Sequence, residues 1–349
     1  MPPPQVEEGD TLAASPAGAS ALPVPVRWQR ELAEAIRDPG ELLRMLALPV
    51  ELQPAAERVA RRFPLLVPRG FAALMTAGDV SDPLLRQVLP IVDEEAEVVG
   101  FSADPLSESG CGTVPGLLHK YHGRALLVTT GACAVHCRYC FRRHFPYDDL
   151  PRGRRWWQPA LEHLAGDASL SEVLLSGGDP LTLPDAQLAA LAGDLAAIPH
   201  LKRLRLHSRL PVVLPSRVDE ALIAWLTGTR LTPVVVIHAN HPQELSPAVV
   251  AACGRLRAAG ITVLNQSVLL AGINDRVETL AALSEALFAA GVLPYYLHLL
   301  DRVQGAAHFL VGDRLALELH RDLAARLPGY LVPRLVREEP GYPGKTPVR

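Results

Sequence analysis

Residues 125–140 read ALLVTTGACAVHCRYC, a short apolar run followed at once by a turn that carries three cysteines. Five more apolar runs follow, and amphipathic, Ala- and Leu-rich stretches separate them. Strands that alternate with helices indicate parallel βαβ units, which fit an incomplete α/β barrel or an open doubly wound sheet. The expected strands are 125–129, 173–175, 204–207, 234–238, 263–270 and 293–299, and the expected helices are 185–197, 219–226, 247–259, 277–290 and 314–327.

Polar and glycine residues gather where these strands end. CAVHC follows the first strand, and SGGDP, HSRLP and HANHP follow the second, third and fourth. In both candidate folds the functional site lies at the carboxyl ends of the strands. The sequence therefore predicts a site at that edge.

Composition excludes several classes of protein. The 349 residues are 49% hydrophobic and 20% charged, with a net charge of −3, which excludes an acidic disordered chain, a basic nucleic-acid coat and a disulfide-dense miniprotein. Basic residues are dispersed, so nucleic-acid binding has little support. No apolar run approaches the roughly 20 residues that cross a membrane, and no signal peptide is visible, so a cytoplasmic location is expected.

The chain divides into three expected parts. Residues 1–25, rich in Pro, Ala, Ser and Gly, read as a flexible leader. Residues 26–100 read as a helical extension, with helices expected at ELAEAIRD (31–38), ELLRMLAL (41–48) and AAERVARRF (55–63). Residues 101–349 hold the α/β part.

The cysteine cluster carries the strongest chemical signal. Cys133, Cys137 and Cys140 form C-x3-C-x2-C, so three thiolates can bind three of the four irons of a [4Fe-4S] cubane and leave the fourth iron open. Three neighbouring arginines are expected to offset the charge of the cluster and its thiolates: Arg138, Arg142 and Arg143.

Two other interpretations of the cysteines remain. One is a structural zinc site with His136 or His144 as the fourth ligand, although such sites usually space their cysteines in two pairs. The other is a group of unrelated buried thiols. Cys111 and Cys253 are isolated and are expected to be ordinary thiols.

CAVHCRYC after a first strand resembles the signature of the radical S-adenosylmethionine (SAM) enzymes, in which the open iron chelates SAM. SGGDPL, residues 176–181, resembles the glycine motif that holds the SAM amino group. Glycines let a backbone approach a ligand closely, and a carboxylate can accept from an ammonium. The resemblance implies SAM contacts from Ser176, Gly177, Gly178, Asp179 and His238.

A wider set of motifs resembles the lysine 2,3-aminomutases, and most of all the short members that serve β-lysylation of elongation factor P. They are GLLHKYHGR, CAVHCRYCFRRHFPY, SGGDPL, NQSVLLAGIND, PYYLHLLD and PGYPGK, in that order. The resemblance implies an incomplete (β/α)6 radical SAM barrel with an N-terminal helical extension and a C-terminal tail that binds pyridoxal 5′-phosphate (PLP).

The resemblance also implies roles for residues outside the cysteine loop. Lys345 would hold PLP through a Schiff base and is the expected catalytic residue, although composition alone favours a solvated tail lysine. The other expected contacts are Lys120 and Arg124 with the PLP phosphate, Gln266 near PLP, Arg142 with the substrate carboxylate, and Asp301 and Glu338 with the distal ammonium of lysine.

The implied reaction is the isomerisation of free L-α-lysine to β-lysine. The resemblance further implies an electron donor such as flavodoxin or ferredoxin, and a ligase that attaches β-lysine to elongation factor P. A homo-oligomer is possible, and no membrane or nucleic-acid partner is expected. Arg276 stands where zinc-containing relatives carry a cysteine, so no structural zinc is expected.

Three alternatives remain open. The chain could supply free β-lysine to another pathway, or it could be an aminomutase of another amino acid such as glutamate. Asp301 and Glu338 argue against glutamate, whose distal carboxylate would meet two acids. A third alternative is a non-catalytic iron–sulfur or redox-sensing protein, which would bind no PLP.

Overall fold

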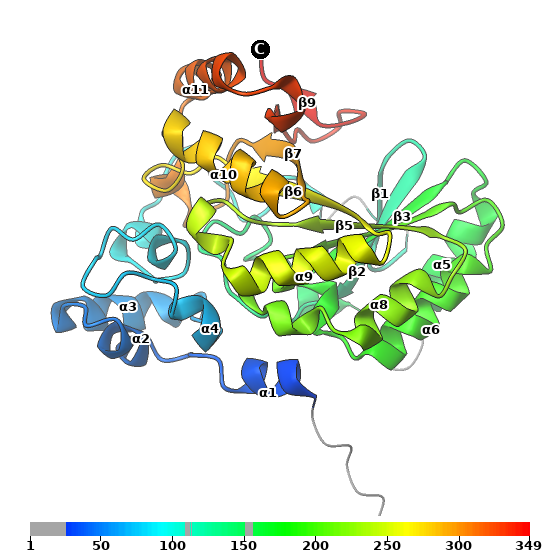
Figure 1. Ribbon diagram of the computed structural model, residues 1–349, viewed down its shortest axis with the longest axis horizontal. Coiled ribbons are helices and arrows are strands. Elements are labelled where there is room, and N and C mark those ends of the chain that lie inside the picture. Colours follow the sequence, from blue (N-terminus) through cyan, green and yellow to red (C-terminus); the bar gives the residue numbers. More distant parts are fainter. Residues whose placement is uncertain (1–25, 109–111, 113, 151–155) are drawn as a thin grey trace, which may run out of the picture.

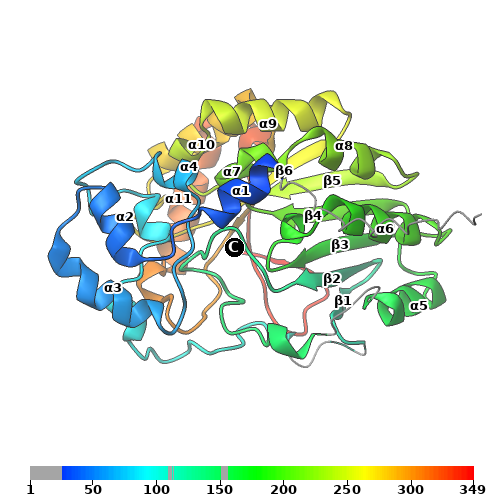
Figure 2. The ribbon, with the colours of Figure 1, turned by 90° about the horizontal axis from the view of Figure 1, so that it is seen from below.

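The computed structural model describes residues 26–108, 112, 114–150 and 156–349. The expected leader 1–25 and Cys111 lie outside the described residues. In the described part, a single curved sheet carries helices on its outer side, and the N-terminal helices lie against one end of it (Figures 1 and 2).

The sheet has nine strands in sequence order. Strands β2 to β8 run parallel, whereas β1 pairs with β2 and β9 pairs with β8 in antiparallel fashion. The two ends of the sheet, β1 and β9, are not paired with each other in the described part of the chain, so the barrel is open. The strands are β1 (Leu117–Tyr121), β2 (Arg124–Thr130), β3 (Glu172–Gly177), β4 (Arg203–Ser208), β5 (Thr232–Ile237), β6 (Thr262–Val268), β7 (Leu293–His298), β8 (Arg334–Arg337) and β9 (Thr346–Pro347).

The helices of the α/β part cover the outer face of the sheet (Figure 1). All six expected strands and all five expected helices are confirmed, with small differences at their ends. Strands β1, β8 and β9 and helices α5 and α7 were not predicted. The helices are α5 (Gln158–Gly166), α6 (Asp185–Ala196), α7 (Leu210–Val213), α8 (Glu220–Thr227), α9 (Pro247–Ala258), α10 (Val277–Ala289) and α11 (Asp313–Arg326).

The helical extension contains α1 (Arg27–Ala33), α2 (Pro39–Met45), α3 (Gln53–Ala60) and α4 (Arg69–Ala72). The first helix expected here, over 31–38, is wrong because α1 lies earlier and ends at Ala33. Asp38 instead accepts hydrogen bonds from the first backbone amides of α2, and Pro39 begins that helix. A residue that precedes proline is disfavoured in the helical conformation, so the chain is extended there.

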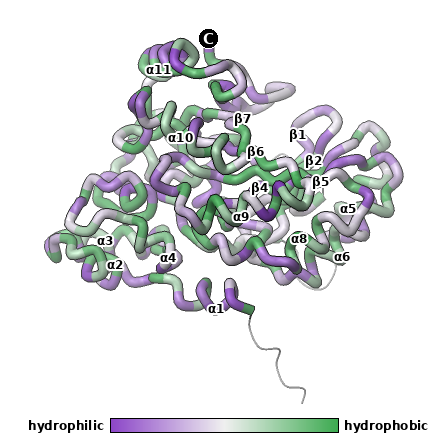
Figure 3. The backbone as a smooth tube through the Cα atoms, viewed as in Figure 1, coloured by the Kyte–Doolittle hydropathy of each residue, from purple (hydrophilic) through white to green (hydrophobic). Residues whose placement is uncertain are grey.

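Strand alternation separates the core from the site. On β3, Val173 and Leu175 are buried, and on β4 the same is true of Leu204 and Leu206. Because side chains alternate across a sheet, the intervening residues of both strands point to the inner face and line its pocket. Figure 3 shows the hydrophobic colour along the central strand β5, which is consistent with its burial beneath the helices. No helix in the described ranges is both long and apolar enough to cross a lipid bilayer.

Candidate functional site

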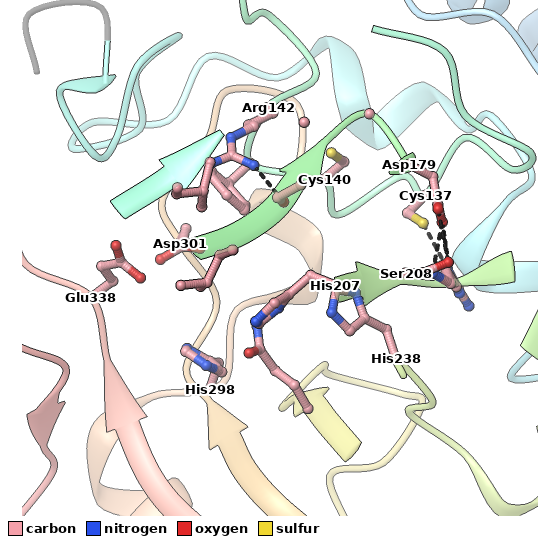
Figure 4. Close-up of a pocket in the computed structure, with 18 of the residues that line it drawn as sticks. Cys137, Cys140, Arg142, Asp179, His207, Ser208, His238, His298, Asp301 and Glu338 are labelled. Carbon is pink, nitrogen blue, oxygen red and sulfur yellow. Dashed lines mark hydrogen bonds between the residues drawn. The ribbon is translucent and has the colours of Figure 1, made fainter. Parts of the chain in front are cut away.

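A cavity of about 490 Å³ lies on the inner face of the sheet, and residues at the carboxyl ends of the strands line much of it. The structure brings every site residue expected from the sequence to this cavity. The lining includes Cys133, Cys137, Cys140, Ser176, Gly177, Gly178, Asp179, His238, Lys120, Arg124, Gln266, Lys345, Arg142, Asp301 and Glu338. Figure 4 shows the cysteine wall of this pocket facing the wall that carries Asp301 and Glu338.

The three cysteines form one wall, in the loop that follows β2. Burial, and then the neighbouring thiol of Cys137, raises the pKa of Cys140 to about 11. The guanidinium of Arg209 donates to Cys137 Sγ at 2.7 Å (Figure 4) and is itself almost completely buried. Three thiols beside a buried cation suit a metal cluster, because the cation offsets thiolate charge.

Two of the expected cations on this wall also have an anionic partner. Nη2 of Arg138 and Nη2 of Arg143 each donate to Glu94 Oε2, at 2.6 and 2.7 Å. The charges of Arg142 and Arg143 act against the rise in the pKa of Cys140, as expected of cations near a thiolate. Glu94 comes from the helical extension, and its side chain is only 2% exposed. The cation that contacts a cysteine is Arg209, from the HSRLP turn after β4, which the sequence marked only as a polar strand end.

The two glycines of the SGGDPL motif have a packing role. A Cβ on Gly177, whose φ is +125°, would lie 2.6 Å from the carbonyl oxygen of Thr130, and one on Gly178 would collide with Ala132. The two glycines therefore let β3 pack directly on the start of the cysteine loop.

Asp179, the acid of the same motif, is held by groups within the chain. Both of its carboxylate oxygens accept from Ser208 Oγ, at 2.8 and 3.0 Å, and they also accept from the backbone amides of Leu181, Arg209 and Leu210. Burial raises its pKa to about 6 despite these bonds. These donors hold the carboxylate in place at the wall of the pocket, and its contact with SAM stays a prediction.

Arg142 lies between the two walls with a partner that the sequence did not reveal. Its Nε and Nη2 donate to Glu108 at 2.6 and 2.9 Å, and its Nη1 donates to Ser176 Oγ at 3.1 Å. Lys120 Nζ also donates to Glu108, at 3.1 Å. Burial opposes the charge on Glu108, but Arg142 and then Lys120 keep the pKa of Glu108 below its ordinary value. Glu108 precedes β1 in a stretch without a motif, so no sequence signal pointed to it.

The opposite wall is built by the C-terminal tail. Strand β9 pairs with β8 so that Thr346 lies opposite Arg337, which places Lys345 beside Glu338. Lys345 Nζ donates to Glu338 Oε2 at 2.9 Å and lies 5.5 Å from the centre of the Tyr296 ring. The expected loop lysine is therefore held inside the pocket by a short strand pairing.

The two acids of this wall differ in their electrostatics. Burial raises the pKa of Asp301 to about 7, and the nearby charge of Glu338 adds to the effect. Burial acts on Glu338 in the same direction, but Lys345, Tyr121 and Lys120 together bring the pKa of Glu338 below its ordinary value. Glu338 is thus charged near neutral pH, whereas Asp301 is partly protonated.

The centre of the pocket is polar but uncharged. Within the described part of the chain, Nε2 of His207, His238 and His298 is buried and has no hydrogen-bond partner. Oε1 of Gln266 is also buried and has none there. Burial lowers the pKa of all three histidines, that of His238 to about 4. Buried polar groups without partners are costly, so these atoms fit a ligand that can hydrogen-bond to them.

The residues present fit the expected cofactors. Lys120 and Arg124, with Arg124 stacked 4.5 Å over the Tyr121 ring, offer cations for a phosphate, and Lys345 offers a primary amine on the same side. The cysteine wall offers three thiols for a cluster. His207 and His298 were not predicted, although His298 lies in the quoted PYYLHLLD motif.

No family model matches the chain. Among curated proteins it is 52% identical over 322 residues to the L-lysine 2,3-aminomutase of Escherichia coli (strain K12), which covers 92% of this chain and 94% of that protein. It is 47% identical to the enzyme of the same name from Haemophilus influenzae, over 91% and 94% of the two chains. It is also 34% identical to the L-lysine 2,3-aminomutase of Clostridium subterminale, over 92% of this chain and 77% of that protein.

Two solved structures are also similar. A radical SAM methyltransferase from Sphaerobacter thermophilus matches with a TM-score of 0.41 and 19% identity, over 63% of this chain and 68% of that chain. Coproporphyrinogen III oxidase from Escherichia coli, a radical SAM enzyme, matches with a TM-score of 0.41 and 14% identity, over 64% of this chain and 54% of that chain.

Proposed function

Since this chain belongs to the family of L-lysine 2,3-aminomutases, which are isomerases, we propose that it moves the α-amino group of free L-lysine to the β carbon with a [4Fe-4S] cluster, SAM and PLP. One observation carries the proposal. Three cysteines from the loop after β2 and Lys345 from the far end of the chain line the same cavity. A structural metal site would not need that amine, and a PLP enzyme alone would not need those thiols.

When bound, the cluster and SAM supply a hydrogen-abstracting radical, and PLP supplies the π-system that carries the migrating amino group. Lys345 holds PLP, and the cations of Lys120 and Arg124 hold its phosphate. The buried inner face of the sheet excludes water from the radical.

The charged side chains orient the substrate. Arg142 Nη1, the guanidinium nitrogen not bonded to Glu108, receives the lysine carboxylate. Asp301 and Glu338 receive the distal ammonium at the tail wall. An amino acid without that ammonium would leave the buried Asp301 without the cation that its charged form needs, so the pocket selects against it.

We also propose that the β-lysine is passed to a ligase that attaches it to elongation factor P. This step rests on the resemblance of the quoted motifs to the short family members. The competing possibility is release of β-lysine to another pathway. Adding the ligase and elongation factor P to the reaction distinguishes them, because only the proposed use gives β-lysylated elongation factor P.

Anaerobic reconstitution with iron, sulfide, PLP, SAM and dithionite tests the isomerase. Wild-type protein given L-lysine should form β-lysine, detected by mass spectrometry, and Cys137→Ala and Lys345→Ala should each abolish it. Two matched controls should retain activity: Cys253→Ala, a thiol buried on α9, and Lys202→Ala, an exposed lysine. Product from either pocket variant would contradict the proposal.

A further inference from the structure

Away from the pocket, three potential metal ligands converge between β1 and α5. His119 lies on β1, His163 on α5, and Asp167 directly follows α5. One ligand atom from each lies within 4.8 Å of the other two. His119 Nδ1 is 3.8 Å from Asp167 Oδ2, and the two imidazole rings meet edge to face with centres 6.3 Å apart.

The carboxylate of Asp167 is already oriented. Its Oδ1 accepts from the backbone amide and the hydroxyl of Ser169, at 3.0 and 2.6 Å, which leaves Oδ2 toward His119. Outer hydrogen bonds of this kind fix metal-ligating carboxylates in known sites.

The cluster is partly sheltered as well as oriented. The side chains of His119 and Asp167 are 31% and 32% exposed, so an ion could enter from solvent yet be held by chain on several sides. Ligand atoms around a tetrahedral zinc ion lie about 3.3 Å apart, given bonds of about 2.0–2.1 Å. The ligand atoms lie within 4.8 Å of one another, so each separation has to shorten by at most about 1.5 Å, which side-chain rotation can supply.

We propose that His119, His163 and Asp167 form a binding site for a divalent transition-metal ion, with zinc the best match. Two imidazoles and one carboxylate are a donor set that zinc accepts, and hard oxygen-loving cations such as magnesium and calcium do not favour imidazole. With three protein ligands, water completes the coordination. The site is separate from the cysteine loop and does not depend on the proposed reaction.

The proposed metal site lies where it could link the outer strand β1 to helix α5. β1 lies at one end of the described sheet, where its neighbouring strand is β2. Its residues alternate, so that His119 points outward while Lys120 faces the pocket and bonds Glu108. An ion shared by β1 and α5 would tie this outer strand to the helix and thereby steady the pocket residue next to it.

Calorimetric titration of zinc into the cluster-loaded protein, desalted and kept anaerobic, tests the site. The wild-type chain should bind zinc with a dissociation constant on the order of micromolar. His163→Gln and Asp167→Asn should each weaken binding at least tenfold. His122→Gln, an exposed histidine in the turn after β1, is the matched control and should bind as wild type does. Asparagine at 167 retains an acceptor for Ser169, so the local turn is preserved.

Thermal unfolding supplies a second measurement. Zinc should raise the melting temperature of the wild-type chain and of His122→Gln but not that of His163→Gln, because an ion that binds only the folded state stabilises it. Equal zinc affinity in wild type, His163→Gln and Asp167→Asn would overturn the proposal. So would a wild-type chain with no zinc binding beyond that of His163→Gln.

Discussion

The cysteine wall and the tail wall of the pocket are built in opposite ways. The cysteine wall is one continuous loop, and glutamates that are almost completely buried, Glu94 and Glu244, pair with the arginines around it. The tail wall is assembled from β1, from the segments after β7 and β8, and from Lys345, which directly precedes β9. Its central ion pair joins Lys345 and Glu338, whose side chains are 18% and 16% exposed. The first wall is held by buried charge pairs, the second by strand register. We therefore expect changes in the cysteine wall to lower the stability of the fold, and changes in the tail wall to lower activity.

Removing the buried anion of the cysteine wall should have the largest effect. Glu94→Ala leaves the guanidinium groups of Arg138 and Arg143 buried without their partner. Breaking a buried pair in this way costs about 3–5 kcal/mol, so we expect a loss of that size in the free energy of unfolding, measured with urea. Glu95→Ala is the matched control, because Glu95 pairs with Arg58 at the surface and its loss should change stability little. Similar losses in the two variants would show that the cysteine wall is not held by buried charge.

Removing β9 should break the tail wall without unfolding the chain. A chain that ends at Lys345 lacks the pairing of Thr346 with Arg337 that places this lysine beside Glu338. We expect activity to fall by roughly 100-fold, because a small misplacement of a reacting group costs about that factor, with weaker PLP absorbance and only a small change in melting temperature. Deletion of Arg349 alone is the control. Full PLP loading without β9 would mean that the register is not what positions Lys345.

The pH dependence of lysine binding should distinguish the acids of the tail wall. Since burial and then Glu338 raise the pKa of Asp301 to about 7, only the form above that pH carries the charge that an ammonium needs. Lysine affinity should rise roughly tenfold between about pH 6 and pH 8, and this rise should vanish in Asp301→Asn. A pH profile unchanged by the substitution would place the titration on another group.

The raised pKa of Asp301 also makes the free energy of unfolding depend on pH. The folded chain keeps a proton on Asp301 that the unfolded chain, with an ordinary pKa of 3.8, releases at lower pH. The contribution of Asp301 to stability is thus fully present below about pH 4 and is lost as the pH rises to about 7. Relative to wild type, Asp301→Asn should gain stability across that interval, as measured by urea unfolding at several pH values.

The smallest effect is expected at the edge of the tail wall. Tyr121 hydrogen-bonds Glu338, and Tyr121→Phe removes that bond while keeping the ring under Arg124. A bond of this kind contributes about 1 kcal/mol, so the KM for lysine should rise about fivefold with kcat unchanged. A fall in kcat with KM unchanged would show that Tyr121 acts on the chemistry and not on the position of Glu338.

The contrast between the walls also explains what could be predicted from the sequence. The six central strands and five helices show clear periodicity because each buries a continuous face. β9 has two residues and β1 and β8 lie near the ends of the sheet, so their patterns are too short to recognise. The cysteines could be assigned because their spacing is local. Glu108 and Arg209 could not, because their partners Arg142 and Cys137 lie 34 and 72 positions away.

The bonds between the helical extension and the cysteine loop bear on protein engineering. Glu94 holds two arginines of that loop, and Gln87 accepts from Arg209, which in turn contacts Cys137. Chimeras that graft the barrel of one relative onto the leading helices of another would separate these partners. Recombination breakpoints are therefore best placed before residue 87, so that donor and acceptor travel together.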